Sequence, residues 1–159
     1  VRESKHPVIT IRGKEHHDGC KNILVPLDLT KETREKIDKA IEIAKLFSAD
    51  IRVISVLSQK DEDSENKLIS YSNQVWRHIR EQGVRATIKT IRGGDIPKMV
   101  LEYAKEVDAD LIMIMSKDKL NIKEFFIGTT AQQIINKSII PVLSIRPMER
   151  KDTSVFVPY

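Results

Sequence analysis

The 159-residue chain contains few residues of several types that would mark particular classes of protein. It has one cysteine, so no disulfide can form within it, and we expect a reducing, cytoplasmic setting. Aromatic residues make up 5% of the sequence, too few to build a stacking platform for single-stranded nucleic acid. No apolar run approaches the roughly 18 residues of a membrane-spanning helix. We therefore expect neither a nucleic-acid partner nor a membrane partner.

Charge and length narrow the remaining classes. The 27 basic and 23 acidic residues give a net charge of +4, but the two signs are interspersed, so no basic stripe forms. The length suits one domain with a substantial core. His16, His17 and Cys20 lie close together in the sequence, but no second ligand pair stands at zinc spacing. We expect no metal site.

Apolar, strand-like runs alternate with segments of helical periodicity along the chain. The predicted strands are residues 22–29, 51–57, 84–91, 111–115 and 142–146. The predicted buried stripes of the first three helices are Ile37, Ala40, Ile41, Ala44 and Phe47 or Ser48; Leu68, Ser72, Val75 and Ile79; and Ile96, Val100, Tyr103, Ala104 and Val107. Such alternation predicts an α/β fold, a doubly wound five-stranded parallel sheet with helices on both faces. The expected strand order is 3-2-1-4-5, because the first strand is apolar throughout and the third alternates like an edge strand.

Several local signals set the expected element boundaries. Thr30 and Asp95 can cap helices, and Gly83 can end one. The acidic residues 61–65 are expected to form a solvated stretch before the second helix. Gly128-Thr129-Thr130 can open the last helix, where free backbone N–H groups and the positive dipole end would suit a phosphate. A simple N-cap is the alternative interpretation of that tripeptide.

The sequence also repeats a short segment near its two ends. Residues 4–12 match residues 138–146 at a constant offset of 134 residues. The identical pairs are Ser4 with Ser138, Pro7 with Pro141, Val8 with Val142, Ile11 with Ile145 and Arg12 with Arg146. We interpret residues 1–20 as the last strand of a preceding copy of the domain plus a linker, residues 21–147 as the domain itself, and residues 148–159 as a tail.

Ligands of doubly wound sheets bind beyond the carboxyl ends of the strands, where the strand order reverses. The groups expected there are Asp28, residues 56–58, Gly93-Gly94, residues 115–118 and Gly128. Lys117, Lys119 and Lys123 follow the fourth strand and could contact a phosphate as point charges or could lie in a solvated loop.

Four segments together resemble the universal stress protein family. They are KNILVPLDLT with its Pro-x-Asp ending, ISVL, IRGGD, and IGTTAQQIINKSIIPVLSIRP near the carboxyl end. The resemblance covers residues 21–147 and implies an adenine nucleotide alpha hydrolase-like fold. In ATP-binding members the last region looks like G-x2-G-x9-G-[ST]. Registering its final pair on Gly128 and Thr129 places the first two glycines at Met115 and Asp118, so both are lost here.

The resemblance also implies a set of ligand-contacting positions. They are Asp28 after the first strand, Val56 for adenine, and Gly128, Thr129 and Thr130 on the phosphate side, with Met115, Lys117 and Asp118 in the altered loop. Many family members hold no ATP, and the two lost glycines point to that group. We predict no cofactor beyond weak binding of ATP or another adenine nucleotide.

Other proteins with this strand order fit the residues less well. A phosphorelay receiver needs an acidic pair at the first strand, and only Asp28 is there. A flavodoxin needs a hydroxyl- and glycine-rich loop where this chain has LTKE. No Ser-His-Asp or Cys-His set can be assembled from the strand ends. We therefore predict a non-enzymatic stress-response module that acts through protein association; the alternative is an ATP-binding universal stress protein with weak ATP hydrolysis.

The fifth strand predicts where association occurs. It lies at a sheet edge with Val142, Leu143, Ser144 and Ile145, and open edges of this kind are usually covered in natural proteins. The segment from Pro7 to Arg12 is expected to pair with it as an added antiparallel edge strand, within the chain or by exchange with a second molecule. The resemblance implies that family dimers cover the same edge with the partner's equivalent strand.

Overall fold

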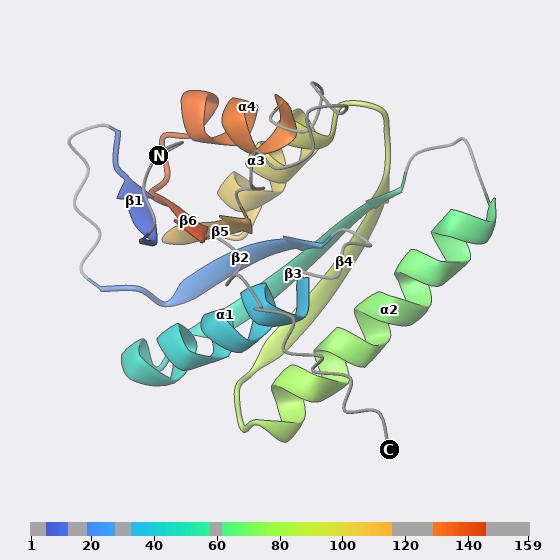
Figure 1. The fold of residues 1–159 in the computed structure, drawn as a ribbon, viewed down its shortest axis with the longest axis horizontal. Helices are drawn as coiled ribbons and strands as arrows, with labels where there is room; N and C mark the ends of the chain where they lie inside the picture. Colours follow the sequence, from blue (N-terminus) through green and yellow to red (C-terminus); the bar gives the residue numbers. More distant parts are fainter. Residues whose placement is uncertain (1–5, 13–18, 28–32, 58–61, 116–128, 146–159) are drawn as a thin grey trace, which may run out of the picture.

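The computed structural model describes residues 6–12, 19–27, 33–57, 62–115 and 129–145. Within these residues, one sheet lies between two layers of helices (Figure 1). Its strands are β1 (Val8–Thr10), β2 (Asn22–Leu27), β3 (Asp50–Leu57), β4 (Ala86–Arg92), β5 (Leu111–Met115) and β6 (Val142–Ile145). The helices are α1 (Thr33–Phe47), α2 (Glu62–Glu81), α3 (Ile96–Glu106) and α4 (Thr129–Lys137). None of these helices is long and apolar enough to cross a bilayer.

The sheet has the strand order β1-β6-β5-β2-β3-β4. Strands β2 to β6 pair in parallel, and β1 pairs antiparallel with β6. The predicted order is therefore confirmed, with the apolar β2 in the middle and the alternating β4 at the edge of the parallel part. As an edge strand, β4 has one side and part of one face open to water and so tolerates polar residues. Strand β2 is enclosed by neighbouring strands and helices, so its residues are mostly apolar.

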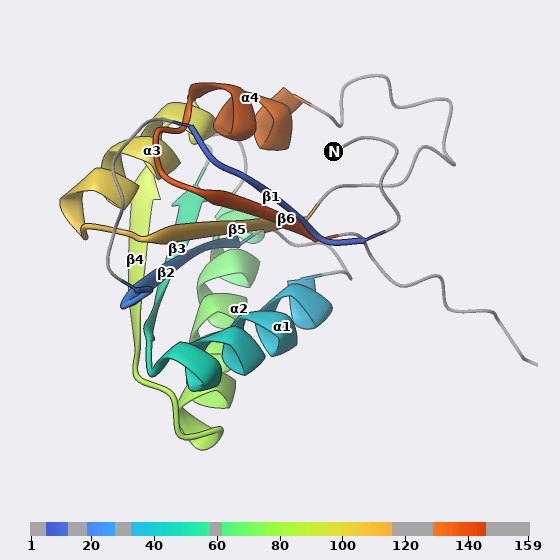
Figure 2. The same cartoon turned by 90° about the vertical axis from the view of Figure 1, so that its left-hand side faces the viewer.

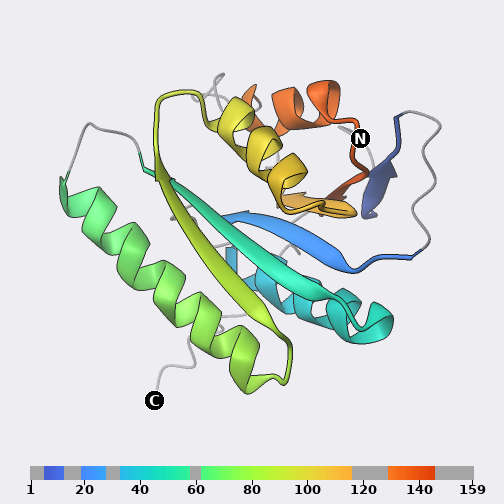
Figure 3. The same cartoon turned by 180° about the vertical axis from the view of Figure 1, so that it is seen from behind.

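Two apolar cores form because side chains of successive strand residues point to opposite faces. On one face α1 and α2 cover Ile23, Val25 and Val53. On the other face α3 and α4 cover Leu24 and Ile54 (Figure 1). Seen from behind, α2 runs along β4 and α3 lies across the sheet on the opposite side (Figure 3). This layering confirms the doubly wound fold.

The amino-terminal strand β1 lies beside β6, the last strand along the chain (Figure 2). Ile9 pairs with Leu143 at the centre, flanked by Val8 with Ser144 and Thr10 with Val142. The guanidinium of Arg12 donates to the Asn136 carbonyl at the end of α4. The predicted edge strand is thus confirmed, in a three-residue form. It supplies hydrogen-bond partners to an edge that would otherwise be open.

Three helices end in the same way, with a left-handed residue followed by a buried one. The left-handed residues are Ser48 (φ 54°), Gly83 (φ 80°) and Asp108 (φ 49°). The N–H of the next residue donates to the carbonyl five residues back, Ala49 to Ala44 at 2.8 Å, Val84 to Ile79 at 3.3 Å and Ala109 to Ala104 at 2.9 Å. This hydrogen bond is characteristic of a Schellman motif. At each of the three helix ends it directs the backbone toward the next strand.

Two sequence predictions about side-chain burial are wrong. Phe47 is 53% exposed and Ser48 is exposed as well, because the left-handed turn at Ser48 ends α1 and brings Ala49 into the core instead. The acidic stretch is also not wholly solvated. Helix α2 begins at Glu62, and Glu65 in its first turn is 7% exposed. Its carboxylate pairs with the Arg92 guanidinium at 2.5 Å, which offsets the cost of burying it.

Candidate functional site

The strand order reverses between β2 and β5, and the two ladders of β2 differ in length. Pairing with β3 continues to Leu27 opposite Ser55. Pairing with β5 ends at Leu24 opposite Ile112, although β5 itself runs on to Met115. Beyond Leu24 in β2 and Ile112 in β5, the two strands are not paired with one another. Such a switch point is where open α/β sheets bind their ligands.

Two of the predicted contact residues end their strands on opposite faces of the sheet. Val56 is the penultimate residue of β3, is 9% exposed and packs in the core beneath α3 and α4. Met115 is the last residue of β5 and is partly buried against the core beneath α1 and α2. The last residue of β5 is therefore a methionine, at the position where the resemblance expects a glycine.

The predicted phosphate-side helix is present. Helix α4 begins at Thr129, directly after Gly128, and Thr130 in its first turn is exposed. Its first turn carries no acidic residue, so no carboxylate there competes for its free N–H groups. The other predicted residues, Asp28, Lys117, Asp118 and Gly128, lie outside the described residues.

A residue that the sequence reasoning missed also stands at the switch point. Lys36 lies in α1 one turn after its start and is 3% exposed, and its ammonium donates to the Pro26 carbonyl at 2.5 Å. The available signal was its spacing, since it lies four residues before Ala40 and eight before Ala44, both buried. A lysine on the buried face of a helix is uncommon enough to be noticed.

The Gly93-Gly94 pair ends β4 and has a packing reason. The Gly93 N–H donates to the Leu57 carbonyl at 3.0 Å, which holds the end of β4 against β3. A Cβ at Gly93 would come within 2.1 Å of the Met99 sulfur, so a side chain here would displace Met99. Asp95 then caps α3 as predicted, accepting from the Lys98 N–H at 3.1 Å.

Two observations on the described side chains concern metal binding and thiol chemistry. They include no group of three or more His, Cys, Asp or Glu side chains arranged to hold a metal ion. Burial, followed by the charge of Asp110, raises the pKa of Cys20 to about 11. The thiol is therefore protonated at neutral pH and is a poor nucleophile and metal ligand.

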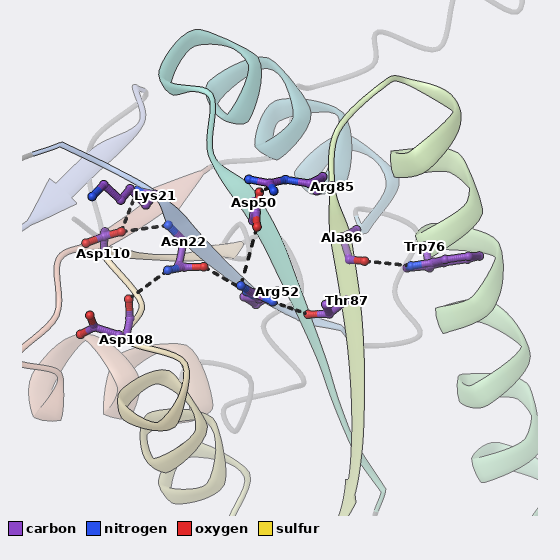
Figure 4. Close-up of polar contacts among 10 residues, drawn as sticks. All are labelled: Lys21, Asn22, Asp50, Arg52, Trp76, Arg85, Ala86, Thr87, Asp108 and Asp110. Atoms are coloured by element: carbon purple, nitrogen blue, oxygen red, sulfur yellow. Dashed lines mark hydrogen bonds and ion pairs between the residues drawn. The ribbon is translucent and has the colours of Figure 1, made fainter.

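At the amino ends of the parallel strands, opposite the switch point, polar side chains form a connected network (Figure 4). The Asp110 carboxylate accepts from the N–H groups of Lys21 and Asn22 at 2.7 and 2.8 Å. The Asn22 side chain accepts from the Arg52 guanidinium at 3.0 Å, and Arg52 also reaches Thr87 at 3.3 Å. These hydrogen bonds connect the amino ends of neighbouring strands. The network therefore stabilises the sheet and needs no ligand to account for it.

Comparison with known proteins identifies the family. The model of the universal stress protein family matches residues 19–146. The chain belongs to the universal stress protein family. A chain assigned to this family in Staphylococcus saprophyticus is 25% identical over 142 residues, covering 81% of this chain and 85% of the relative. A second, from Staphylococcus haemolyticus, is 23% identical with 81% and 86% coverage.

Solved structures of this family share the fold. A universal stress protein from Archaeoglobus fulgidus superposes with a TM-score of 0.75 at 19% identity, over 93% of this chain and 52% of that one. This chain therefore spans about half the length of that protein. A universal stress protein solved in complex with cAMP gives a TM-score of 0.68 at 16% identity, over 82% of this chain and 100% of that one. An Archaeoglobus fulgidus protein in complex with dAMP gives 0.65 at 22% identity, over 79% and 97%.

Proposed function

We propose that this universal stress protein is a cytoplasmic, non-enzymatic stress-response module that acts through protein association and has a degenerate ATP-binding cleft. The observation that carries the proposal is Met115. It ends β5 at the switch point, and its side chain packs against the core beneath α1 and α2. A glycine there would let a phosphate approach the backbone closely, whereas a packed methionine keeps it at a distance.

The parts of a nucleotide site that remain support weak binding of the adenine class. Val56 is the penultimate residue of β3, and α4 opens with hydroxyl residues and no acidic residue. The neighbours solved with cAMP and dAMP hold adenine nucleotides on the same fold. Asp118 would add a carboxylate at the second lost glycine, where it would repel a phosphate.

Nucleotide content and affinity test this proposal. We expect mass spectrometry of gently purified protein to find no stoichiometric ATP, and calorimetry to give a dissociation constant in the high micromolar range or weaker. Met115→Gly combined with Asp118→Gly should raise ATP affinity at least about tenfold, or roughly 1.4 kcal/mol. The matched control is Met115→Ala with Asp118→Ala. It removes the carboxylate and all of each side chain beyond the Cβ, so it should recover only part of the gain.

Two results would contradict the proposal. Tight ATP binding by the unmodified chain would mean that other groups replace the missing backbone contacts. Phosphate release from ATP, abolished by changing Asp28, would instead support the weakly hydrolysing alternative.

We further propose that association runs through the β1–β6 edge. Strand β1 (Val8–Thr10) pairs with β6, and Ile9 on it and Ile11 just after it are 55% and 69% exposed. Pairing between Val8 and Ser144 and between Ile9 and Leu143 would be the same if the strand came from a second molecule or from a preceding repeat.

Truncation tests the role of this edge. Deleting residues 1–15 should uncover β6 and cause self-association or aggregation in analytical ultracentrifugation. Deleting residues 1–5 leaves β1 in place and should have no such effect. A longer truncation that remains as soluble, and in the same oligomeric state, as the parent would count against the proposal.

A further inference from the structure

The two outermost strands of the sheet differ in what covers them. Strand β1 covers β6, whereas no strand among the described residues lies beyond β4. Strand β4 is seven residues long, and each of its residues is exposed or only partly buried. A long strand with no neighbour on one side is a template on which another extended chain can pair.

The hydrogen bonds at the two ends of β4 show which of its backbone groups face outward. The Arg85 carbonyl accepts from β3 at 2.9 Å, and the Gly93 N–H donates to β3 at 3.0 Å. The register with β3 is continuous between them, so the odd-numbered residues direct their backbone groups toward β3. The even-numbered residues direct theirs outward, and those of Ile88 and Thr90 have no partner among the described residues.

Helix α2 runs along β4 and turns one strip of side chains toward its outer side (Figure 3). The Trp76 indole N–H donates to the Ala86 carbonyl at 3.0 Å at the start of β4 (Figure 4). Glu65 pairs with Arg92 at the end of β4. The other side of α2 faces α1, which His78 contacts. The strip from Glu65 to Trp76 therefore lies beside the outward-facing backbone of β4.

Two apolar side chains of this strip are left partly uncovered. Ile69 is 37% exposed and Trp76 is 39% exposed, and seven residues of helix place them two turns apart on the same face. A strand paired with β4 would lie about 4.8 Å farther out, and its side chains on the α2 face would pack over both. One extended segment would thus satisfy the free backbone groups and cover the apolar strip.

The charges around β4 indicate which segment fits. Strand β4 carries Lys89 and Arg92 and no acidic residue, and the Arg85 side chain just before it is 77% exposed. Each of these three has one acidic partner within the fold. Arg80 has none among the described residues, and its guanidinium lies 6.0 Å from the centre of the Trp76 ring. A second copy of β4 would bring basic side chains together, whereas an acidic strand would pair with them.

We propose that the outer side of β4 binds an extended acidic segment of a partner protein by strand addition. The backbone of that segment pairs with Ile88 and Thr90. An apolar side chain covers Ile69 and Trp76, and a carboxylate lies beside Arg80. This surface is separate from the β1–β6 edge and from the adenine site, and it depends on neither.

The test uses the full chain, in which Trp76 is the only tryptophan, so that intrinsic fluorescence reports on this surface. The probes are two short synthetic peptides with blocked ends that alternate valine and threonine, one flanked by glutamates and the other by lysines. The acidic peptide should change the Trp76 fluorescence and shift the amide signals of Ile88 and Thr90 in NMR. It should bind at least about tenfold tighter than the basic peptide.

Two pairs of variants separate backbone pairing from charge. Thr90→Pro removes an outward N–H and should weaken binding of the acidic peptide at least about fivefold, whereas Thr90→Val keeps that N–H and should stay within about twofold of the parent. Arg80→Glu should weaken the acidic peptide at least about threefold and strengthen the basic one. Lys67→Glu makes the same kind of charge change on another exposed part of α2 and should leave both affinities within about twofold.

Four results would overturn the proposal. They are an unchanged Trp76 fluorescence with the acidic peptide, equal affinities for the two peptides, equal binding by Thr90→Pro and Thr90→Val, and equal effects of Arg80→Glu and Lys67→Glu. Concentration-dependent shifts of Ile88 and Thr90 without peptide would show that a second copy occupies the surface, which also contradicts it. If Thr90→Pro does not fold, an acidic peptide with methylated backbone nitrogens replaces it and should not bind.

Discussion

The two ends of the parallel strands are built differently; we call them the amino edge and the carboxyl edge of the sheet. At the amino edge, polar side chains pair with one another and with the backbone, from Asp110 through Asn22 and Arg52 to Thr87 (Figure 4). At the carboxyl edge, β2 and β5 are no longer paired, and a buried lysine reaches a strand carbonyl there.

The difference shows how one fold separates stability from ligand binding. Polar groups that satisfy one another lower the free energy of the folded state and leave little to offer a ligand. Open α/β sheets bind their ligands beyond the carboxyl ends of the strands, where the strand order reverses. Substitutions at the amino edge should therefore change stability, and those at the carboxyl edge should change binding.

The largest stability effect is expected at Asp110. Asp110→Ala removes the carboxylate that accepts from two backbone N–H groups, at Lys21 and Asn22, and should lower the free energy of unfolding by about 2 kcal/mol. Urea denaturation measures it. Asp108→Asn is the control, because asparagine tolerates the left-handed backbone there and the Asp108 carbonyl that accepts from Asn22 is kept. An Asp110 variant as stable as the control would contradict the structural role of this edge.

A smaller effect, with a contrast of sign, is expected at two buried serines. The Ser72 hydroxyl bonds to Ser55 at 2.6 Å and to the Leu68 carbonyl at 2.7 Å, so Ser72→Ala should destabilise by about 1 kcal/mol. Among the described residues, the buried Ser144 hydroxyl has no hydrogen-bond partner. Ser144→Ala should therefore stabilise the protein by about 1 kcal/mol in the same denaturation assay. Destabilisation by both variants to the same extent would show that Ser144 is satisfied in solution.

The last effect appears only at alkaline pH and is expected at Cys20, beside Asp110. The pKa of this thiol rises from 9.0 to about 11 on folding, so the folded state keeps a proton that the unfolded state loses between those values. Its contribution to stability is complete below pH 9 and is lost as the pH rises toward 11. Relative to the parent, Cys20→Ala should lack this part of the decline. Identical pH profiles for the two proteins would mean that folding does not shift this pKa.

Much of the fold was predictable because it depends on patterns that are local in sequence. Continuous apolar runs predicted the buried strands, and the alternation in residues 84–91 predicted the edge position of β4. The repeated segment predicted that β1 would lie beside β6, since strands with the same pattern of side chains can cover the same edge. Helix ends were less predictable, because the turn at Ser48 decides that Ala49 rather than Phe47 is buried.

The site was less predictable because its residues are brought together only by the fold. Lys36 was absent from the predicted buried stripe because that pattern considers apolar residues alone, yet its side chain is buried. Glu65 was assigned to solvent because its partner, Arg92, is distant in sequence. Val56 and Met115 were predicted from their places at strand ends and from the family resemblance, and the structure adds that they lie on opposite faces of the sheet.

The most direct test of the account is to map where ATP contacts the chain and how tightly. An NMR titration of the unmodified protein with ATP should shift the amide signals of Val56, Met115 and Thr130 at the carboxyl edge and leave those of Asn22, Arg52 and Asp110 unchanged. The dissociation constant should lie in the high micromolar range or above. Sub-micromolar binding, or shifts centred on the amino edge, would contradict the account.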